Sequence, residues 1–268
     1  VKLDANENPL SIPGPLRKEF SARLASIALN RYPDAGSPGL NGRFAKAFGV
    51  GPDQVIVGNG SDELIQILCS AIARPGAEVM IPTPTFAMYR ISALNAGCRV
   101  AEVPLDAGFD LDIEAMRARI AAHAPALTFL AWPNNPTGNC FSQDRIEAIL
   151  QASDGIVVVD EAYCHFSGRT FLPQMGRHGN LVVLRTLSKV GFAAMRIGML
   201  IGPAVLVHEL NKVRLPYNLN AFSQAAAAFY LDYEETFLEQ AEEICLLRGE
   251  LFAALEGIPG IRPWPTDA

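Results

Sequence analysis

The sequence predicts an α/β protein in which a mostly parallel sheet is flanked by helices. From Gln54 onward, short apolar runs rich in valine and isoleucine alternate with longer segments in which apolar residues recur at helical spacing. The chain has 268 residues, of which 50% are hydrophobic and 19% are charged, so that it can bury a large core. These observations predict one large or two ordinary domains and argue against disorder.

Strands are expected where the apolar runs are short and bounded by turn residues. The predicted strands are Val55 to Val57, Glu78 to Ile81, Leu127 to Ala131, Ile156 to Val159, Leu181 to Leu184 and Ile197 to Ile201. The predicted helices lie between them, at Asp62 to Ala73, Phe86 to Ala96, Ile113 to Ala122 and Arg145 to Ala152, the last with Ser142 as its N-cap.

After Pro216 the sequence predicts helices only. The segment Glu234 to Leu255 is long and periodic, and Gly257 and Pro259 follow it as helix-ending residues. Because such a helix often links two domains, we predict that a large domain ends near it and covers residues 31–235. Residues 1–30 are predicted to form an extended Pro-rich arm, which is a poor candidate for independent folding. Residues 236–268 would form the linking helix and the start of a truncated smaller α/β domain. The apolar residues on the helical period are Phe237, Ile244, Leu247, Leu251 and Leu255.

The two ends of the sequence indicate a piece of a longer protein. Val1 is not an initiator methionine, and the sequence stops at Thr266-Asp267-Ala268 without a terminal helix or cap. We therefore expect the chain to be clipped at both ends.

Charge and cysteine content limit the possible partners and compartment. The formal net charge of −6 argues against nucleic acid or an acidic membrane as the main partner, because both bind clustered Lys and Arg. The 5 cysteines show no CxxC spacing, which indicates reduced thiols in the cytosol, and the 4 histidines show no metal-ligand spacing. No apolar run approaches the ~20 residues of a membrane-spanning helix, and no signal pattern begins the chain. The sequence predicts a soluble, cytoplasmic protein.

Lys189 closely follows a predicted strand, in the run RTLSK at residues 185–189, and Arg196 precedes the next strand. Ligands of doubly wound sheets bind at the carboxyl ends of the strands, so an amine there can form a Schiff base if its charge is suppressed. Taken alone, such a segment more often contains an ordinary loop lysine.

Another buried run ends in a carboxylate. The sequence IVVVDEAY at residues 156–163 places Asp160 at the end of a strand and Tyr163 three positions later. A fixed carboxylate raises the pKa of a ring nitrogen, which a cofactor acting as an electron sink requires. The alternative is a Walker B strand that holds magnesium, but that function needs a GxxxxGK[ST] loop, which the sequence lacks.

The run WPNNPTG at residues 132–138 follows a third predicted strand. Asparagines between prolines form tight turns, and a rigid turn can also aim an amide at the phenolate oxygen of a cofactor ring. The segment by itself does not separate these two interpretations.

The run GNGSDE at residues 58–63 lies between a predicted strand and a predicted helix. Backbone amides at a helix N-terminus bind phosphate well. A dinucleotide fingerprint would require a third glycine where Glu63 stands, and an isolated GxG is more often a structural turn.

The run PTPTF at residues 82–86 follows a further strand and presents Phe86. This ring could stack on a flat cofactor, although a phenylalanine is more often a core residue. All five segments follow predicted strands, however, and together they supply an amine, a carboxylate, a phenol, an amide, a phosphate cradle and an aromatic plate. Coincidence is therefore the weaker explanation.

The set of motifs resembles the fold type I pyridoxal-phosphate aminotransferases, and more narrowly the histidinol-phosphate aminotransferases. PNNPTG, DEAY and SK are typical of the whole superfamily, whereas LDANENP at residues 3–9 and NRYP at residues 30–33 indicate the narrower family. The resemblance covers essentially the whole chain and extends through PTPTFAMY and RTLSKVGFAAMRIG.

The resemblance implies roles for these residues toward pyridoxal 5'-phosphate. Lys189 would hold the cofactor as a Schiff base and move the substrate proton, and Asp160 would pair with the pyridine nitrogen. Asn135 and Tyr163 would bond to the ring oxygen, and Phe86 would stack on the ring. The phosphate would be bound by Gly60, Ser61, Asp62, Ser188 and Arg196, and by Tyr32 reaching across from a partner subunit.

The resemblance also implies an activity and an assembly. An amino group would move between the small-molecule donor L-histidinol phosphate and the 2-oxo acid 2-oxoglutarate, in histidine biosynthesis, and a homodimer would share its active sites. Another fold type I enzyme, such as an amino-acid aminotransferase or a phospho-amino-acid decarboxylase, would have the same cofactor residues. A binding domain without turnover is the alternative from a different class. The family's second domain supplies a substrate-binding arginine, and Arg262 matches no motif for that role.

Overall fold

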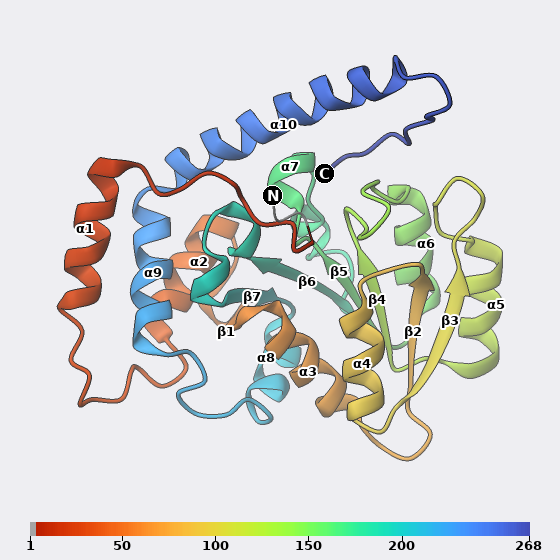
Figure 1. Ribbon diagram of the computed structural model, residues 1–268. Coiled ribbons are helices and arrows are strands. Elements are labelled where there is room, and N and C mark those ends of the chain that lie inside the picture. Colours follow the sequence, from red (N-terminus) through yellow and green to blue (C-terminus); the bar gives the residue numbers. More distant parts are fainter. Residues whose placement is uncertain (1–3) are drawn as a thin grey trace.

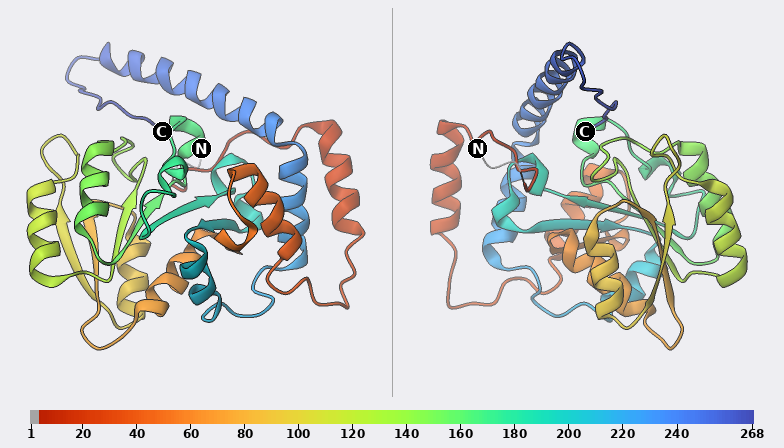
Figure 2. Two further views of the ribbon diagram at one scale, coloured as in Figure 1. Left: turned by 180° about the vertical axis from the view of Figure 1, so that it is seen from behind. Right: turned by 45° about the vertical axis from the view of Figure 1, so that its right-hand side comes forward.

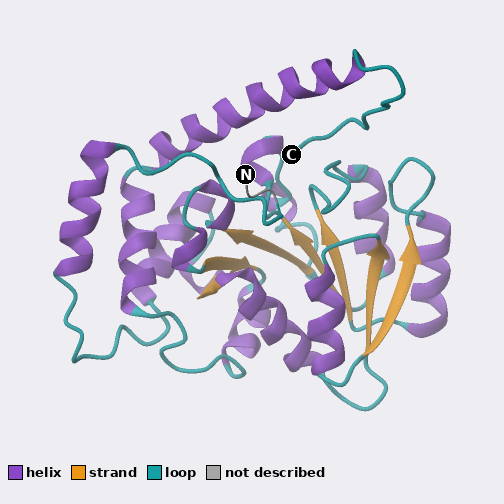
Figure 3. Ribbon diagram, in the orientation of Figure 1, coloured by secondary structure: helices purple, strands orange, loops and turns teal. Residues whose placement is uncertain are grey.

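The computed structural model describes residues 4–268, so the first residues of the predicted arm and Leu3 of the LDANENP motif lie outside the described residues. Within this range the chain forms one sheet of seven strands. Figure 3 shows this sheet enclosed by helices on both faces. The predicted α/β class is confirmed.

The strand order in the sheet is β1-β7-β6-β5-β4-β2-β3 (Figure 1). Neighbouring strands are parallel except at β7, which runs antiparallel to both β6 and β1. The carboxyl ends of the other strands therefore meet at one edge, where β7 begins. The strands are β1 (Val55–Asn59), β2 (Glu78–Thr83), β3 (Arg99–Pro104), β4 (Leu127–Ala131), β5 (Ile156–Asp160), β6 (Leu181–Thr186) and β7 (Ile197–Ile201).

Every predicted strand forms, and β4 and β7 have the predicted bounds. The sequence prediction omitted β3, which lies at the sheet edge and pairs only with β2 among the described strands. Arg99 and Glu102 are exposed while Ala101 and Val103 are buried. An edge strand with alternating burial carries no continuous apolar run, which explains the omission.

The helices divide between the two faces of the sheet. One hydrophobic cluster contains residues of α3, α4 and α8 with one set of strand side chains, and a second contains residues of α1, α2, α5, α6, α9 and α10 with the alternate set. The helices are α1 (Gly14–Ala25), α2 (Pro38–Phe48), α3 (Gly60–Ile72), α4 (Ala87–Asn95), α5 (Ile113–His123), α6 (Gln143–Ala152), α7 (Cys164–Ser167), α8 (Ala204–Asn211), α9 (Ala221–Asp232) and α10 (Glu234–Glu256). Short 3-10 turns are η1 (Pro52–Gln54), η2 (Leu172–Gln174), η3 (Ser188–Val190) and η4 (Ala193–Met195).

The predicted N-cap of α6 is correct in position but not in its interaction. Ser142 is the N-cap residue, yet its side chain makes no capping hydrogen bond. The hydroxyl instead donates to the Asp110 carboxylate, and the Ser142 backbone N–H donates to the same side chain. The competing acceptor fixes the loop before α5 against the start of α6.

Helix α10 follows the predicted long segment almost residue for residue. Figure 2 shows it passing over the carboxyl edge of the sheet and extending beyond it, with the following segment returning toward α7. Phe237 and Ala241 are the buried residues of this described helix, whereas Leu247 and Leu251 are 52% and 61% exposed. The predicted domain boundaries at residues 30/31 and 235/236 stay predictions. Within residues 4–268, no helix combines the length and apolar character needed to cross a membrane.

Candidate active site

The carboxyl edge of the sheet contains a cavity of about 440 Å³. It lies where parallel strands end and loops begin, the usual binding edge of an open α/β sheet. The predicted site residues that line it are Ser61, Asp62, Phe86, Asn135, Asp160, Tyr163, Ser188, Lys189 and Arg196. The structure therefore brings together residues that are up to 135 positions apart in the chain, as Ser61 and Arg196 are.

Lys189 projects its amine into this cavity from η3, directly after β6. Its Nζ donates to the backbone carbonyl of Ala5 at 3.0 Å and lies 5.5 Å from the centre of the Tyr163 ring. Burial lowers the pKa of Lys189, and the nearby positive charge of Arg196 acts in the same direction. A larger fraction of this amine is thus neutral than in an exposed lysine.

Asp160 ends β5 and is 3% exposed. Its Oδ1 accepts the Ala162 N–H at 3.0 Å, and its Oδ2 accepts the Tyr89 hydroxyl at 2.7 Å. Among the described residues no Lys or Arg forms an ion pair with this carboxylate. Burial raises the pKa of Asp160 from its ordinary 3.8 to about 6, although the hydrogen bonds oppose the shift.

Tyr163 holds its hydroxyl between two asparagine amides. Asn6 Nδ2 donates to Tyr163 Oη at 3.1 Å, and Asn135 Nδ2 donates to it at 3.5 Å. Burial raises the pKa of Tyr163, so the phenol keeps its proton at neutral pH. The sequence prediction did not include Asn6, because an extended arm has no periodicity that would place it at the cavity.

The phosphate cradle predicted from GNGSDE lies between the end of β1 and the start of α3. Gly60 has φ +79°, and a Cβ there would lie 2.4 Å from Arg196 Nη2. A Cβ at Gly198 on β7 would lie 2.4 Å from the Ser61 backbone nitrogen. The positive φ favours glycine at position 60, and the close approach of β7 to the first residues of α3 requires glycine at position 198.

Two side chains complete this end of the cavity. Arg196 Nη2 donates to Asp62 Oδ2 at 2.9 Å. Ser188 Oγ lies 2.9 Å from Thr186 Oγ1, whose single hydrogen also has the Ile197 carbonyl within reach at 3.0 Å. Positive charge, a hydroxyl and helix-end amides together form an anion site.

Phe86 stands at the N-terminus of α4 on the wall of the same cavity. Its ring meets the ring of Tyr89 edge to face, at 5.5 Å between centres. Tyr89 in turn stacks on Phe129 at 4.6 Å with an interplanar angle of 3°. The sequence prediction missed Tyr89, although its position three residues after Phe86 on a helix places both on one face.

Asn134 is the buried member of the asparagine pair and supports the loops on either side. Its Nδ2 donates to the Pro84 carbonyl at 3.0 Å and to Thr137 Oγ1 at 2.8 Å, and its Oδ1 accepts from Thr85 at 2.8 Å. Asn134 therefore stabilises the turn, and Asn135 lines the cavity, while a bond from the Asn135 amide to a cofactor ring stays a prediction.

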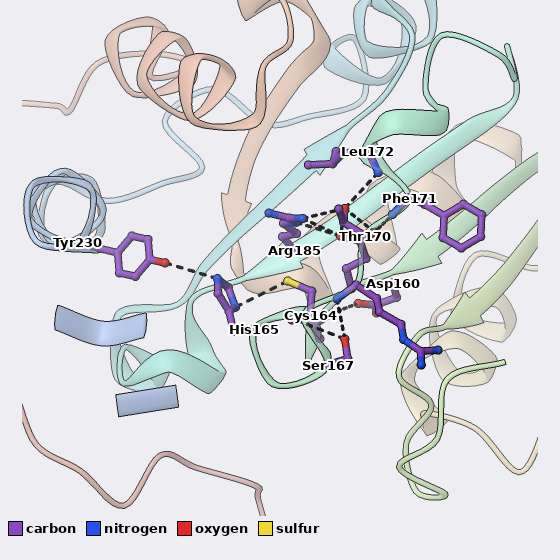
Figure 4. A network of polar contacts seen from close by, with 12 residues as sticks. Asp160, Cys164, His165, Ser167, Thr170, Phe171, Leu172, Arg185 and Tyr230 are labelled. Carbon is purple, nitrogen blue, oxygen red and sulfur yellow. Dashed lines mark hydrogen bonds and ion pairs between the residues drawn. The ribbon is translucent and has the colours of Figure 1, made fainter. Parts of the chain in front are cut away.

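A buried ion pair lies directly beside Asp160. Glu161 is fully buried and accepts from Arg185 Nε at 3.0 Å and Nη2 at 2.9 Å. Thr170 Oγ1 and the Phe171 N–H also donate to the Glu161 carboxylate. Figure 4 shows Arg185 of β6 against Thr170, in the segment that follows α7. The cluster thereby fixes the loop that carries Tyr163.

A second chain of contacts lies on the same side, between α7 and α9. Tyr230 Oη lies 3.5 Å from His165 Nε2, and Cys164 Sγ lies 3.7 Å from His165 Nδ1 (Figure 4). Burial lowers the pKa of His165 to about 4, and the charge of Arg185 adds to this effect. His165 is therefore neutral in the folded protein near pH 7.

Two of the predicted site residues are not among the residues that line the cavity: Gly60, which adjoins the lining residue Ser61, and Tyr32, which lies on the surface. The Tyr32 side chain is 81% exposed and stacks on Tyr217 at 4.7 Å between ring centres. The role predicted for Tyr32 involves a partner's cofactor, and it stays a prediction.

The cavity fits the cofactor that the resemblance implies. Asp160 is a buried carboxylate that pairs with no cation within residues 4–268, and a protonated ring nitrogen would compensate its charge. Lys189 supplies an amine with a lowered pKa. The glycine cradle beside Arg196 supplies an anion site of the kind that binds a phosphate group.

Comparison with known proteins gives an independent finding. Residues 1–268 match the family described as aminotransferase class I and II. Histidinol-phosphate aminotransferase 2 of Nitrosococcus oceani is 45% identical over 269 residues, which cover 100% of this chain and 75% of the relative.

Solved structures with the same fold include two aminotransferases. Histidinol-phosphate aminotransferase of Sinorhizobium meliloti in complex with pyridoxal 5'-phosphate has a TM-score of 0.87 at 24% identity, over 98% of this chain and 72% of that one. Aspartate aminotransferase of Thermus thermophilus with maleate has a TM-score of 0.82 at 26% identity, over 97% of this chain and 74% of that one.

Proposed function

The chain belongs to the class I and II aminotransferase family, and we propose that it transfers an amino group between L-histidinol phosphate and 2-oxoglutarate in histidine biosynthesis, using pyridoxal 5'-phosphate. The observation that carries this proposal is the 45% identity to a histidinol-phosphate aminotransferase over the whole of this chain. The cavity supports it because each chemical group that the cofactor needs is present there.

When bound, the cofactor supplies an electron sink that stabilises the negative charge left on the substrate carbon after its proton departs. Lys189 is the proposed base and acid for this proton. Its Nζ can accept the proton when neutral, and the lowered pKa increases the neutral fraction at physiological pH. The carbonyl of Ala5 accepts from the same amine and would orient it.

Asp160 is the proposed partner of the ring nitrogen. Each of its oxygens accepts one described hydrogen bond, and a carboxylate has about four acceptor sites, so capacity remains for a further N–H donor. A positive partner would also relieve the cost of holding this charge away from water.

Asn135 and Tyr163 are the proposed donors to the ring oxygen. Tyr163 Oη accepts from Asn6 and Asn135, which leaves the phenol hydrogen to donate. Phe86 is the proposed plate against the ring face. The proposed phosphate donors are the amides at Gly60, Ser61 and Asp62, with Ser188 Oγ and the Arg196 guanidinium.

We also propose that the protein is a homodimer with shared active sites and that it is cytoplasmic. Tyr32 stacks on Tyr217, and both rings are exposed. Leu29 and Leu215, which lie close to these tyrosines in the sequence, are exposed as well. Exposed aromatic and apolar side chains of this kind are typical of a dimer contact. Five free cysteines are typical of a reducing compartment. The mass measured by light scattering during size exclusion tests the assembly, and a monomer would refute it.

The test of function is absorbance spectroscopy with pyridoxal 5'-phosphate, in the unmodified protein and in Lys189→Ala. We expect a Schiff-base band only when Lys189 is present, with faster bleaching by histidinol phosphate than by aspartate or other amines. Preferential bleaching by aspartate would indicate an amino-acid aminotransferase instead. A band that no amine bleaches would refute turnover altogether.

A further inference from the structure

Tyr89 forms a side-chain hydrogen bond with Asp160, the proposed partner of the cofactor ring nitrogen. Its hydroxyl donates to Asp160 Oδ2 at 2.7 Å, from a side chain that is 0% exposed. The hydroxyl can act only as the donor toward an ionised carboxylate, and burial raises the pKa of Tyr89 well above its ordinary value. The phenol therefore keeps its proton and presents it to Asp160.

The surrounding rings give this hydroxyl a fixed direction. Tyr89 stacks on Phe129 of β4 almost face to face, and it meets Phe86 edge to face. Rotation of the phenol would break both ring contacts. The same side chain thus contacts the proposed plate of the cofactor ring and the proposed partner of its nitrogen.

The contact favours the charged form of Asp160. Burial raises the pKa of Asp160, and the hydrogen bond from Tyr89 is the largest of the effects that lower it. A carboxylate that is to pair with a protonated ring nitrogen has to be charged at working pH.

We propose that Tyr89 is a positioning residue of the reaction, which holds the Asp160 carboxylate charged and correctly oriented against the ring nitrogen of the cofactor. The proposal rests on the proposed role of Asp160. It goes beyond that role by assigning the control of the Asp160 carboxylate to Tyr89 of α4.

The first test is a ¹³C NMR titration of aspartate carboxyl carbons in the full chain without added cofactor, with Asp160→Asn to assign the signal. In Tyr89→Phe we expect the pKa of Asp160 to rise by about one pH unit, because a hydrogen bond to a charged group is lost. The matched control is Tyr230→Phe. Tyr230 is an equally buried tyrosine whose hydroxyl contacts His165 and Glu234, so its loss is expected to leave the Asp160 titration in place.

The second test is the pH dependence of the absorbance of bound pyridoxal phosphate, which we expect to shift in Tyr89→Phe and not in Tyr230→Phe. If Tyr89→Phe does not fold, Phe129→Leu keeps the hydroxyl but removes its stacking partner, and a smaller shift in the same direction is expected. A folded variant with an unchanged Asp160 titration overturns the proposal, as does an equal shift in Tyr230→Phe.

The Asp160→Asn variant separates this proposal from the proposed function. If that variant leaves the absorbance of the bound cofactor unchanged, the role of Asp160 is wrong and the Tyr89 proposal is overturned with it. If Asp160→Asn alters the absorbance while Tyr89→Phe shifts neither titration, only the Tyr89 proposal is overturned.

Discussion

Asp160 and Glu161 are adjacent carboxylates with opposite surroundings. Both are buried at the end of β5, but Glu161 pairs with Arg185 while no described cation pairs with Asp160. The register of β5 with β6 explains the difference, because Asp160 lies opposite Leu184 and the next position of β6 is Arg185. Glu161 therefore has a cation partner within the described residues, whereas Asp160 has none there.

The comparison shows how a fold can tolerate a functional charge. A buried carboxylate without a cation destabilises the folded state, which the raised pKa of Asp160 expresses. The neighbouring ion pair, with further donors from Thr170 and Phe171, fixes the loop and so limits how far Asp160 can escape toward water. The structural ion pair and the proposed partner of the cofactor nitrogen thus use consecutive residues, Asp160 as the last residue of β5 and Glu161 directly after it.

The largest expected effect is on catalysis when Asp160 is neutralised. Asp160→Asn should lower kcat/KM on the order of 10³-fold, since it removes a preorganised charge from the site. The same variant without cofactor should gain about 2 kcal/mol in the free energy of unfolding at pH 8. The sign follows because the folded pKa of about 6 lies above the ordinary 3.8, so the ionised form is penalised above pH 6. Steady-state kinetics and urea unfolding measure the two effects, and a loss of stability would contradict the comparison.

Glu161→Gln should show the reverse pattern. Removing one partner leaves Arg185 buried and unpaired, which should cost about 3 kcal/mol of unfolding free energy. The melting temperature should fall by roughly 10 °C, measured by differential scanning calorimetry. Kinetics of the remaining folded protein should change less than in Asp160→Asn.

The control for Glu161→Gln is the double variant Glu161→Gln with Arg185→Gln. Removing both charges should restore part of the lost stability, because no uncompensated charge remains. A double variant that is less stable than Glu161→Gln would mean that Arg185 contributes chiefly through other contacts, such as its position 5.0 Å from the ring of Phe48.

Sequence patterns predicted the parts of this region that depend on neighbours along the chain. The apolar runs gave β4 and β7 with their bounds, and the residues after each strand gave the members of the cavity. The nearness of Lys189, Asp160 and Asn135 was predictable because parallel strands bring their carboxyl ends to one edge, whereas their individual roles were implied by the family resemblance.

The different partners of Asp160 and Glu161 were not predictable in this way. The pair Glu161 and Arg185 is set by the register of two strands, and the partner of Asp160, Tyr89, lies 71 positions earlier in the chain. A single sequence shows neither that Glu161 lies beside Arg185 nor that Tyr89 lies beside Asp160. In the run IVVVDEAY the sequence analysis assigns no role to Glu161, and its structural role follows from the three-dimensional pairing with Arg185 alone.

The pH dependence of the unfolding free energy offers a smaller effect, which distinguishes Asp160 from His165 near the Glu161–Arg185 pair. The folded pKa of His165 is about 4 and lies below its ordinary 6.5, so its contribution is full above pH 6.5 and is lost as pH falls toward 4. Asp160 changes the unfolding free energy in the opposite direction between about pH 6 and pH 3.8, because protonation removes the cost of burying its charge. Relative to the unmodified protein, His165→Gln should gain about 2 kcal/mol between pH 7 and pH 4.5. Urea unfolding at several pH values measures this difference, and a difference that does not vary with pH would show that His165 is protonated alike in both states.

The smallest expected effect concerns the other arginine–carboxylate pair of the site. Arg196 and Asp62 form an ion pair at 2.9 Å, but their side chains are 42% and 39% exposed, against 14% and 0% for Arg185 and Glu161. Asp62→Asn should therefore change the unfolding free energy by less than about 1 kcal/mol, because water screens the exposed pair. The same change removes a negative charge from the proposed phosphate site, so inorganic phosphate should bind a few-fold more tightly at low salt, and this gain should shrink as salt is added. Thermal unfolding with and without phosphate measures both quantities. A loss of stability as large as that of Glu161→Gln would mean that burial does not distinguish the two pairs.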